Sequence, residues 1–203
     1  MKPSWTFETK FWKFGYSLVA GIDEAGRGAL AGPVVAAAVI LPYKTYPFRD
    51  SKTLSAKQRR EMAATIKREA VAWSLGQASP EEIDRLNILQ ATHLAARRAL
   101  EGLEPKPEAL ITDYLKLQVA QPLLAPAKAD NLSFQVAAAS ILAKTTRDGL
   151  MEEYAESYRD YDFASNKGYG SSSHLKALSQ KGACPIHRRS FKPVMQGRLF
   201  LEP

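Results

Sequence analysis

Hydrophobic residues follow two patterns along this chain: short continuous runs, and longer segments in which they recur every three or four positions. The continuous runs have the length of strands and are bounded by glycine or proline, which predicts buried strands. They lie at residues 18–22, 34–41 and 109–113, with a shorter candidate at 117–119. The helical spacing, opened twice by capping-box sequences, predicts helices over residues 56–73, 79–102, 134–158 and 171–180. Such an alternation is typical of a sheet covered by helices.

Four carboxylates interrupt these apolar elements. Asp23 and Glu24 directly follow the first run, and Asp113 ends the third. Asp148 comes seven residues after Ile141 on the longest predicted helix, which is nearly two full turns and places both on one side. A charge beside a hydrophobic core costs free energy unless another group pairs with it or a cation is coordinated. The pattern therefore predicts a bound cation or titrating groups.

Each carboxylate also has a simpler interpretation. Adjacent residues of a regular strand face opposite sides, so Asp23 and Glu24 can serve one site only if the strand ends or bends there, and otherwise they form a solvated turn. Asp113 could cap the turn that follows it. Asp148 could pair with a neighbouring Arg147 or Lys144 on its own helix. Taken singly, these residues leave the function open.

Composition and charge indicate a globular protein that favours polyanionic partners. The 203 residues, 45% hydrophobic and 24% charged, suit one main globular domain. A net charge of +7 and a pI near 9.5 favour polyanionic partners. Cys184 is the only cysteine, which excludes an intramolecular disulfide and a thiolate metal cluster. The aromatic amino-terminal segment is interrupted by charged residues and fits neither a signal peptide nor a membrane span, so a cytoplasmic location is expected.

Grouped carboxylates in a basic protein suggest phosphate chemistry. Hard divalent cations such as Mg²⁺ and Mn²⁺ prefer oxygen ligands and are often completed by substrate phosphate. Two such ions can activate a water molecule and stabilise the leaving oxygen in phosphodiester hydrolysis. The positive net charge would attract a phosphate backbone. The glycine-rich Gly26-Arg27-Gly28 that follows the acid pair is by itself only a weak phosphate-loop signal.

Five segments of the chain together resemble ribonuclease HII, the type 2 ribonuclease H. They are GIDEAGRGALAGPVVAAAV, DSKTL, AAASILAKTTRD, NKGYGSSSHLKAL and PIHRRSFKPV, in the family's order, and they cover most of the chain from about Val19 to Val194. The resemblance implies an α/β ribonuclease H-like fold, a mixed five-stranded sheet flanked by helices with a small carboxy-terminal helical and loop segment. The implied division is an amino-terminal extension at 1–17, a catalytic domain at 18–158 and a recognition segment at 159–203.

The resemblance also implies an activity and its cofactors. The activity is metal-dependent hydrolysis of the RNA strand in RNA/DNA hybrids, and nicking on the 5′ side of single ribonucleotides embedded in duplex DNA. Two divalent ions, Mg²⁺ or Mn²⁺, would be bound with the substrate. The expected partners are therefore RNA/DNA hybrids and DNA containing ribonucleotides. The protein is expected to act as a monomer and not to bind a membrane.

Site residues are assigned by position in the matching segments. Asp23, Glu24, Asp113 and Asp148 would bind the metal ions. Gly26, Arg27 and Gly28 would recognise the ribonucleotide 2′-hydroxyl, and Tyr169 would stack at the RNA–DNA junction; the 2′-hydroxyl is the group that distinguishes RNA from DNA. The candidate phosphate contacts are basic: Lys52, Lys128, Lys144, Lys167, Arg188 and Arg189.

Tyr114 and the three histidines do not fit the predicted site directly, and two other functions are compatible with the sequence. Tyr114 follows Asp113 where the family usually has glycine, and its side chain is expected to crowd the metal pocket. His93, His174 and His187 show no zinc-ligand spacing and are interpreted as helix-face, cap or phosphate-contact residues. Two other functions stay open: a type 3-like ribonuclease H that cuts only longer hybrids, and a non-catalytic basic module that binds hybrids.

Overall fold

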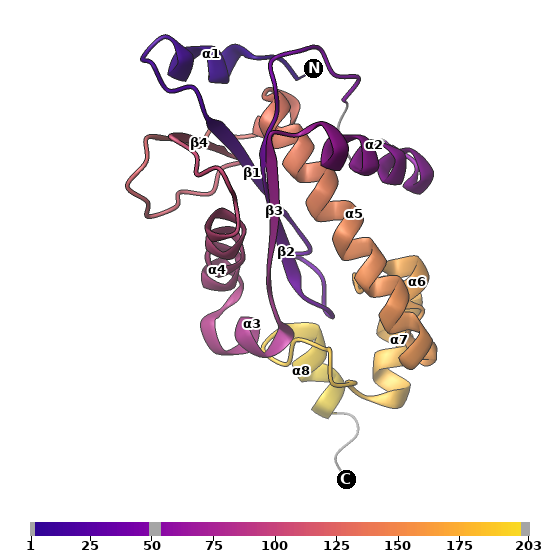
Figure 1. Ribbon diagram of the computed structural model, residues 1–203. Coiled ribbons are helices and arrows are strands. Elements are labelled where there is room, and N and C mark those ends of the chain that lie inside the picture. Colours follow the sequence, from indigo (N-terminus) through magenta and orange to yellow (C-terminus); the bar gives the residue numbers. More distant parts are fainter. Residues whose placement is uncertain (1–2, 49–53, 200–203) are drawn as a thin grey trace.

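The fold is a five-stranded mixed sheet with helices on both faces (Figure 1), seen in a computed structural model that describes residues 3–48 and 54–199. The strands are β1 (Val19–Ala25), β2 (Val34–Ile40), β3 (Ala72–Ala78), β4 (Ala109–Thr112) and β5 (Leu123–Leu124). Their order in the sheet is β3-β2-β1-β4-β5. β2 pairs antiparallel with both β1 and β3. β4 pairs parallel with both β1 and β5. This arrangement confirms the expected fold class.

Helices surround the sheet and form the carboxy-terminal part of the chain. They are α1 (Thr6–Trp12), α2 (Ala56–Glu69), α3 (Pro80–Leu86), α4 (Ile88–Glu101), α5 (Phe134–Ser157), α6 (Phe163–Asn166), α7 (Ser172–Lys181) and α8 (Lys192–Leu199). Short 3₁₀ turns lie at Ala129–Asn131 and Arg159–Tyr161. No helix in the described part of the chain is both long and apolar enough to span a bilayer.

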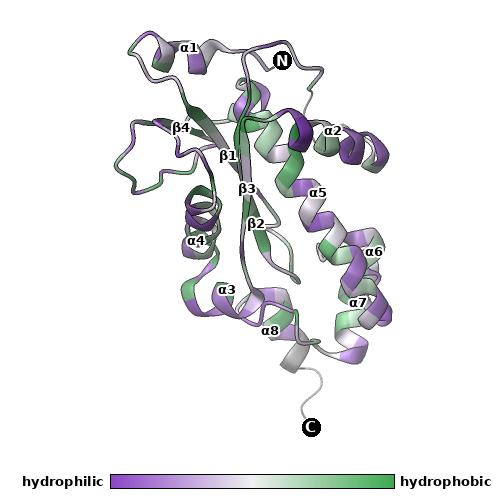
Figure 2. Cartoon of the chain, in the orientation of Figure 1, coloured by the Kyte–Doolittle hydropathy of each residue, from purple (hydrophilic) through white to green (hydrophobic). Residues whose placement is uncertain are grey.

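The helices α4 and α5 lie close to the sheet because glycines and alanines face them. α4 covers one face and α5 the other, with the most hydrophobic positions concentrated in the central strands (Figure 2). A Cβ on Gly21 of β1 would lie 2.1 Å from the backbone of Gln135 in α5, and one on Gly76 of β3 would lie 2.2 Å from the backbone of Ala95 in α4. Glycine at these positions lets each helix approach the sheet closely.

Three predicted elements differ from those observed. The helix predicted over 56–73 ends at Glu69, and residues 72–78 form edge strand β3 because they pair with β2 along its length. The helix predicted over 79–102 is divided at Asn87, whose positive φ of 67° breaks the first helix and whose side chain caps the second. The strand predicted at 117–119 is instead β5, a few residues later. In each case a tertiary or capping contact overrode the local hydrophobic pattern.

The amino-terminal segment is joined to the start of α5 by a buried carboxylate. Glu8 of α1 is fully buried and accepts hydrogen bonds from the Ser133 hydroxyl at 2.5 Å and the Gln135 N–H at 3.3 Å. Burial raises the pKa of Glu8, and the hydrogen bond from Ser133 opposes that rise. Residues before β1 therefore contact the helix that carries one wall of the pocket described next.

Candidate active site

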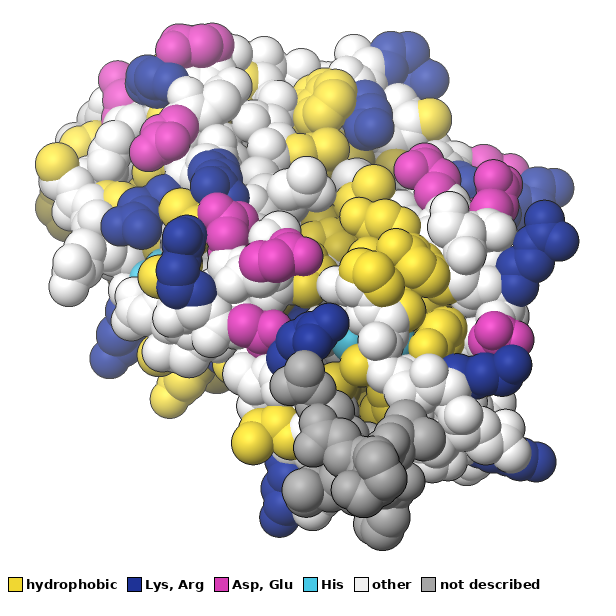
Figure 3. Space-filling model, turned by 90° about the horizontal axis from the view of Figure 1, so that it is seen from below, with side chains coloured by type: hydrophobic (Ala, Val, Ile, Leu, Met, Phe, Trp, Pro, Cys, Tyr) yellow, Lys and Arg dark blue, Asp and Glu magenta, His cyan; other side chains and the backbone are white. Residues whose placement is uncertain are grey.

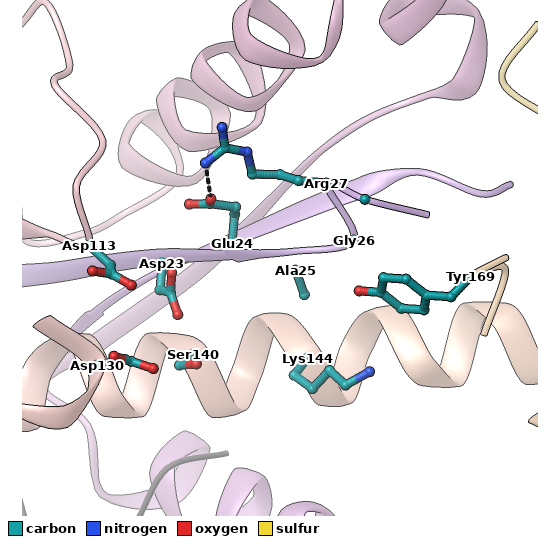
Figure 4. A pocket seen from close by; sticks show the side chains of 11 residues that line it. Asp23, Glu24, Ala25, Gly26, Arg27, Asp113, Asp130, Ser140, Lys144 and Tyr169 are labelled. Atoms are coloured by element: carbon teal, nitrogen blue, oxygen red, sulfur yellow. Dashed lines mark hydrogen bonds and ion pairs between the residues drawn. The ribbon is translucent and has the colours of Figure 1, made fainter. Parts of the chain in front are cut away.

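The sheet register places two of the predicted acids side by side. β1 and β4 are parallel, and Ile22 pairs with Thr112, so Asp23 and Asp113 follow at adjacent positions. β4 ends at Thr112 whereas β1 continues to Ala25, which leaves one edge of β1 open. A cavity of about 460 Å³ lies at this edge. Its lining residues are Asp23, Glu24, Ala25, Gly26, Arg27, Gly28, Asp113, Asp130, Ser140, Lys144 and Tyr169 (Figure 4).

Asp23 and Glu24 both reach the cavity although the strand neither ends nor bends between them. The prediction that it must do so was wrong. Asp23 points toward Ser140 of α5, and Glu24 points to the opposite side, toward Arg27 (Figure 4). Because β4 is short, the cavity extends around the open edge of β1 and is lined by residues from both faces of the strand.

The fourth acid of the cavity is Asp130, not Asp148. Asp130 lies in the short turn before α5 and lines the cavity. Asp148 lies outside it, in ion pairs with Lys144 at 2.6 Å and with Arg59 of α2 at 3.3 Å. The prediction placed Asp148 on the side of the helix that carries Ile141, but the cavity is lined by Ser140. Asp148 comes eight residues after Ser140, which rotates its side chain by about 80° around the helix axis, toward α2.

Asp130 gave no periodic signal because it is not part of a long apolar element. Its only sequence signal was a carboxylate in the polar Lys128-Ala129-Asp130 turn that precedes the long helix. The Asp113 carboxylate accepts a hydrogen bond from the Ala129 N–H at 3.0 Å, which joins this turn to the end of β4. That contact brings Asp130 close to the other acids, and only the folded chain reveals it.

Crowding of acids dominates the electrostatics of the cavity. Burial is the main cause that raises the pKa of Asp23 well above its ordinary value, and the charges of Glu24 and Asp113 add to it, while a hydrogen bond from Ser140 opposes the rise. Burial also raises the pKa of Glu24, although Arg27 counters it through a 3.1 Å ion pair. Because burial and mutual repulsion disfavour ionised carboxylates here, a cation in the cavity would offset both effects.

The donor set suits a hard divalent cation. The acids that line the cavity supply carboxylate oxygens, and no histidine or cysteine is among the described residues that line it. Oxygen ligands favour Mg²⁺ or Mn²⁺ over zinc. Within residues 3–48 and 54–199, no three Asp, Glu, His or Cys side chains already converge as a complete metal-ligand group. An ion would therefore take water and substrate phosphate oxygens as further ligands, as Mg²⁺ commonly does.

The Gly26-Arg27-Gly28 loop, here called the recognition loop, forms the wall next to the acids. Gly26 has a φ of +96°, and a Cβ there would lie 1.9 Å from Nε of the buried Arg147, so both backbone conformation and packing require glycine. No protein atom lies within 4 Å of the position where a Cβ on Gly28 would be. Packing within the protein therefore does not require glycine at position 28.

Tyr169 faces the same cavity from the opposite end. Its side chain is 38% exposed, and its ring lies 5.3 Å from the Arg147 guanidinium carbon and 5.7 Å from Nζ of Lys144. Both cations support the ring through cation–π contacts. Figure 4 shows the Tyr169 ring projecting into the cavity beyond the recognition loop, with the acids at the far end. The ring and the carboxylates thus line the two ends of one cavity.

The basic residues are distributed differently from the prediction. Of the six candidate phosphate contacts, only Lys144 lines the cavity, and Lys52 lies outside the described residues. Lys167 pairs with Glu152 at 2.7 Å, whereas Lys128 and Arg189 are exposed but do not line the cavity. Arg188 is fully buried, so its assignment as a phosphate contact was wrong. Its hydrogen bonds go to backbone oxygens instead.

Tyr114 does not crowd the cavity. Its side chain is 72% exposed and is not among the lining residues. Its φ is +59°, a left-handed conformation that glycine adopts at lower cost than tyrosine.

Two histidines interpreted from the sequence as helix-face, cap or phosphate-contact residues, His174 and His187, are buried together next to the Tyr169 backbone. Nδ1 of His174 lies 2.9 Å from the Tyr169 backbone oxygen, so it carries the proton, and its Nε2 accepts from Nε2 of His187 at 2.9 Å. Nδ1 of His187 accepts from the Cys184 N–H at 3.0 Å. These directions are consistent when both rings are neutral. The pair connects the Tyr169 backbone to the carboxy-terminal segment.

Acid is expected to destabilise the protein through this histidine pair. Burial, and then the charge of His174, lowers the pKa of His187 from 6.5 to about 4. The unfolded chain therefore binds the proton more readily, so the stabilisation is present above pH 6.5 and is lost toward pH 4, by up to about 3 kcal/mol for a shift of this size. In urea unfolding across this range, His187→Gln should lose less additional stability than the parent; equal losses would contradict the assignment.

Comparison with known proteins identifies the relatives of this chain. The sequence model of the family described as ribonuclease HII matches residues 20–194. A ribonuclease HII of Thermus thermophilus is 55% identical over 192 residues, covering 95% of this chain and 94% of the relative. The crystal structure of the ribonuclease H2 from Pyrococcus horikoshii has a TM-score of 0.77 at 27% identity, covering 91% and 99%. A Bst-RNase HIII structure in complex with Mn²⁺, with a TM-score of 0.69 at 17% identity over 90% and 69%, shares the fold.

Proposed function

The chain belongs to the ribonuclease HII family, and from this premise we propose that it nicks duplex DNA on the 5′ side of single embedded ribonucleotides. Membership makes it a ribonuclease H, a hydrolase of phosphodiester bonds. The finer activity is supported by one observation: the acidic end of the cavity, the recognition loop and Tyr169 line a single continuous space. A substrate phosphate and the adjoining sugar can therefore be contacted at the same time.

The acids would hold the metal ions. Asp23, Glu24, Asp113 and Asp130 would supply the oxygen ligands. Bound divalent ions would supply activation of a water molecule and stabilisation of the leaving 3′ oxygen. Ser140 orients the Asp23 carboxylate through its hydrogen bond. The protein's own contribution is to keep these carboxylates together at the open edge of β1 in spite of their mutual repulsion.

The recognition loop and Tyr169 would select the ribonucleotide. The open space beside Gly28 allows a sugar to approach the backbone closely, which a side chain at this position would prevent. Tyr169 would lie against the neighbouring sugar or base, and Lys144 at the cavity wall would attract the phosphate. Because the 2′-hydroxyl is the group that separates RNA from DNA, close backbone approach there supplies the selectivity.

On the face of the molecule seen from below, positive charge is not gathered in one uniform patch. In the view from below, Lys and Arg side chains are interspersed with Asp and Glu around a central group of hydrophobic side chains (Figure 3). We infer that the net charge of +7 provides general attraction to a duplex, and that the cavity determines where cleavage occurs. The protein is proposed to act as a monomer on RNA/DNA hybrids and on ribonucleotide-containing DNA.

One assay tests the proposal against its alternatives. The protein is incubated with a duplex that contains one ribonucleotide and, separately, with a long RNA/DNA hybrid, each in Mg²⁺, Mn²⁺ or chelator. We expect metal-dependent nicking on the 5′ side of the single ribonucleotide, and no cleavage of an all-DNA duplex. Cleavage of the long hybrid alone would indicate a type 3-like specificity. Binding of both substrates without cleavage would indicate a non-catalytic module.

A further inference from the structure

Arg188 is a buried cation whose hydrogen bonds all go to backbone oxygens. Its side chain is fully buried, and no ion pair joins it to an acid among the residues that the structure describes. The guanidinium donates three hydrogen bonds: Nε to the Gly32 oxygen at 3.0 Å, Nη1 to the Arg27 oxygen at 2.9 Å and Nη2 to the Gly26 oxygen at 2.7 Å. Two of the three acceptors are consecutive carbonyls of the recognition loop.

These two hydrogen bonds determine the direction of the loop's N–H groups. In a planar trans peptide unit, the C=O of one residue and the N–H of the next point in opposite directions. The carbonyls of Gly26 and Arg27 point inward to Arg188, so the N–H groups of Arg27 and Gly28 point away from it. The structure gives neither N–H an acceptor among the described residues, and both residues line the acidic cavity.

We propose that Arg188 is a positioning residue that aims the Arg27 and Gly28 N–H groups at the 2′-hydroxyl of the substrate, and so determines the preference for a ribonucleotide. The inference rests on the function proposed above and adds a residue that does not itself touch the substrate. The two N–H groups are the contacting donors. Arg188 holds the backbone in the orientation that exposes them.

The chemistry of the side chain explains why arginine is needed. Burial of a cation is costly, and burial followed by the charge of Arg147 lowers the pKa of Arg188 to about 9. Three charge-assisted hydrogen bonds offset this cost. A planar guanidinium can donate to two neighbouring carbonyls in a fixed geometry, whereas an ammonium is a single point of charge. Lysine would therefore keep the charge but lose control of the loop.

The test compares binding preferences of variants. Fluorescence anisotropy in Ca²⁺ gives the Kd for a duplex with one ribonucleotide and for the same duplex made only of DNA. The parent is expected to prefer the ribonucleotide duplex. Arg188→Lys is expected to reduce that preference about tenfold or more, through the affinity for the ribonucleotide duplex, and to change the affinity for the all-DNA duplex little. Single-turnover nicking at the ribonucleotide should fall in parallel.

A matched control separates positioning from stability. Leu103 is fully buried in the core on the α4 face of the sheet, away from the loop, and Leu103→Ala should destabilise the protein while leaving the binding preference unchanged. If Arg188→Lys keeps the parent's preference, the positioning role is wrong. If the parent itself shows no preference, the proposed function fails and the positioning inference fails with it. If Arg188→Lys and Leu103→Ala reduce the preference equally, Arg188 has only a structural role.

A second measurement does not depend on any variant folding. Amide hydrogen exchange of the Arg27 and Gly28 N–H groups, followed by NMR in the parent protein, should be fast in the free protein because both lack acceptors. It should slow on addition of the ribonucleotide duplex in Ca²⁺ and slow less with the all-DNA duplex. Exchange that is equally slow in the free protein would overturn the outward orientation. Equal slowing by both duplexes would overturn the assignment of these N–H groups to the 2′-hydroxyl.

Discussion

Asp23→Asn is expected to abolish metal-dependent cleavage and, in chelator, to make the protein more stable. Asp23 is buried between Glu24, Asp113 and the hydroxyl of Ser140. Asp23 is a metal ligand in the proposed function, so removing its charge should lower the cleavage rate by on the order of a thousandfold or more. The substitution also removes a buried charge that burial and two neighbouring acids disfavour, so the free energy of unfolding should rise.

The two effects are measured separately. Single-turnover nicking of the one-ribonucleotide duplex gives the rate, and thermal unfolding in chelator gives the stability. Affinity for the duplex in chelator should not fall, because the cavity loses a charge of the same sign as the substrate phosphate. Retained cleavage in Asp23→Asn would refute the metal assignment. Lost cleavage together with lower stability would show that Asp23 supports the fold rather than opposing it.

The second large effect distinguishes Asp130 from Asp148. Asp130 lines the cavity with the other acids, whereas Asp148 is paired with Lys144 and Arg59 beside α2. We expect Asp130→Asn to lower single-turnover cleavage by about a hundredfold or more, because the proposed function makes Asp130 a metal ligand. Asp148→Asn should lower it by only a few-fold, through release of Lys144.

The free energy of unfolding should fall more in Asp148→Asn than in Asp130→Asn, although the cleavage rate should fall less. Asp148→Asn breaks two partly buried ion pairs and should lower the free energy of unfolding by roughly 1 kcal/mol or more. Asp130→Asn removes a charge from a cavity lined by three other acids and should destabilise the protein in chelator less. Titration of cleavage with Mn²⁺ adds a further readout, since only the Asp130 variant should need a higher concentration. Equal activity losses in the two variants would return Asp148 to the active site.

The recognition loop is connected to the acid pair Asp23-Glu24 by the chain itself and by an ion pair. Glu24 is paired with Arg27 of the loop, and Arg188 holds the loop's carbonyls from the protein interior. The loop follows directly on β1, so a shift of the strand end moves acids and loop together. This coupling explains physically why recognition of the sugar and hydrolysis of its phosphate are expected to occur at one fixed spacing.

The hydrophobic pattern of the sequence was sufficient to predict those features that depend on a change from apolar to polar residues within one segment. Asp23 and Asp113 were predicted because each ends an apolar run, and the parallel register places them together. The central strands β1, β2 and β4 and the long helix α5 were predicted for the same reason: burial on a sheet face or helix face leaves a periodic record in the sequence.

Contacts between distant segments were decided only in the folded chain. Which side of α5 faces the cavity depends on the rotation of the helix against β1, so a helical pattern predicted Asp148 while the structure has Asp130. β3 forms because β2 supplies its hydrogen bonds, and Arg188 is buried because backbone oxygens from Gly26 to Gly32 meet it there. Sequence periodicity records which residues avoid water, whereas the direction of a side chain toward a particular partner arises from the packing of elements far apart in the chain.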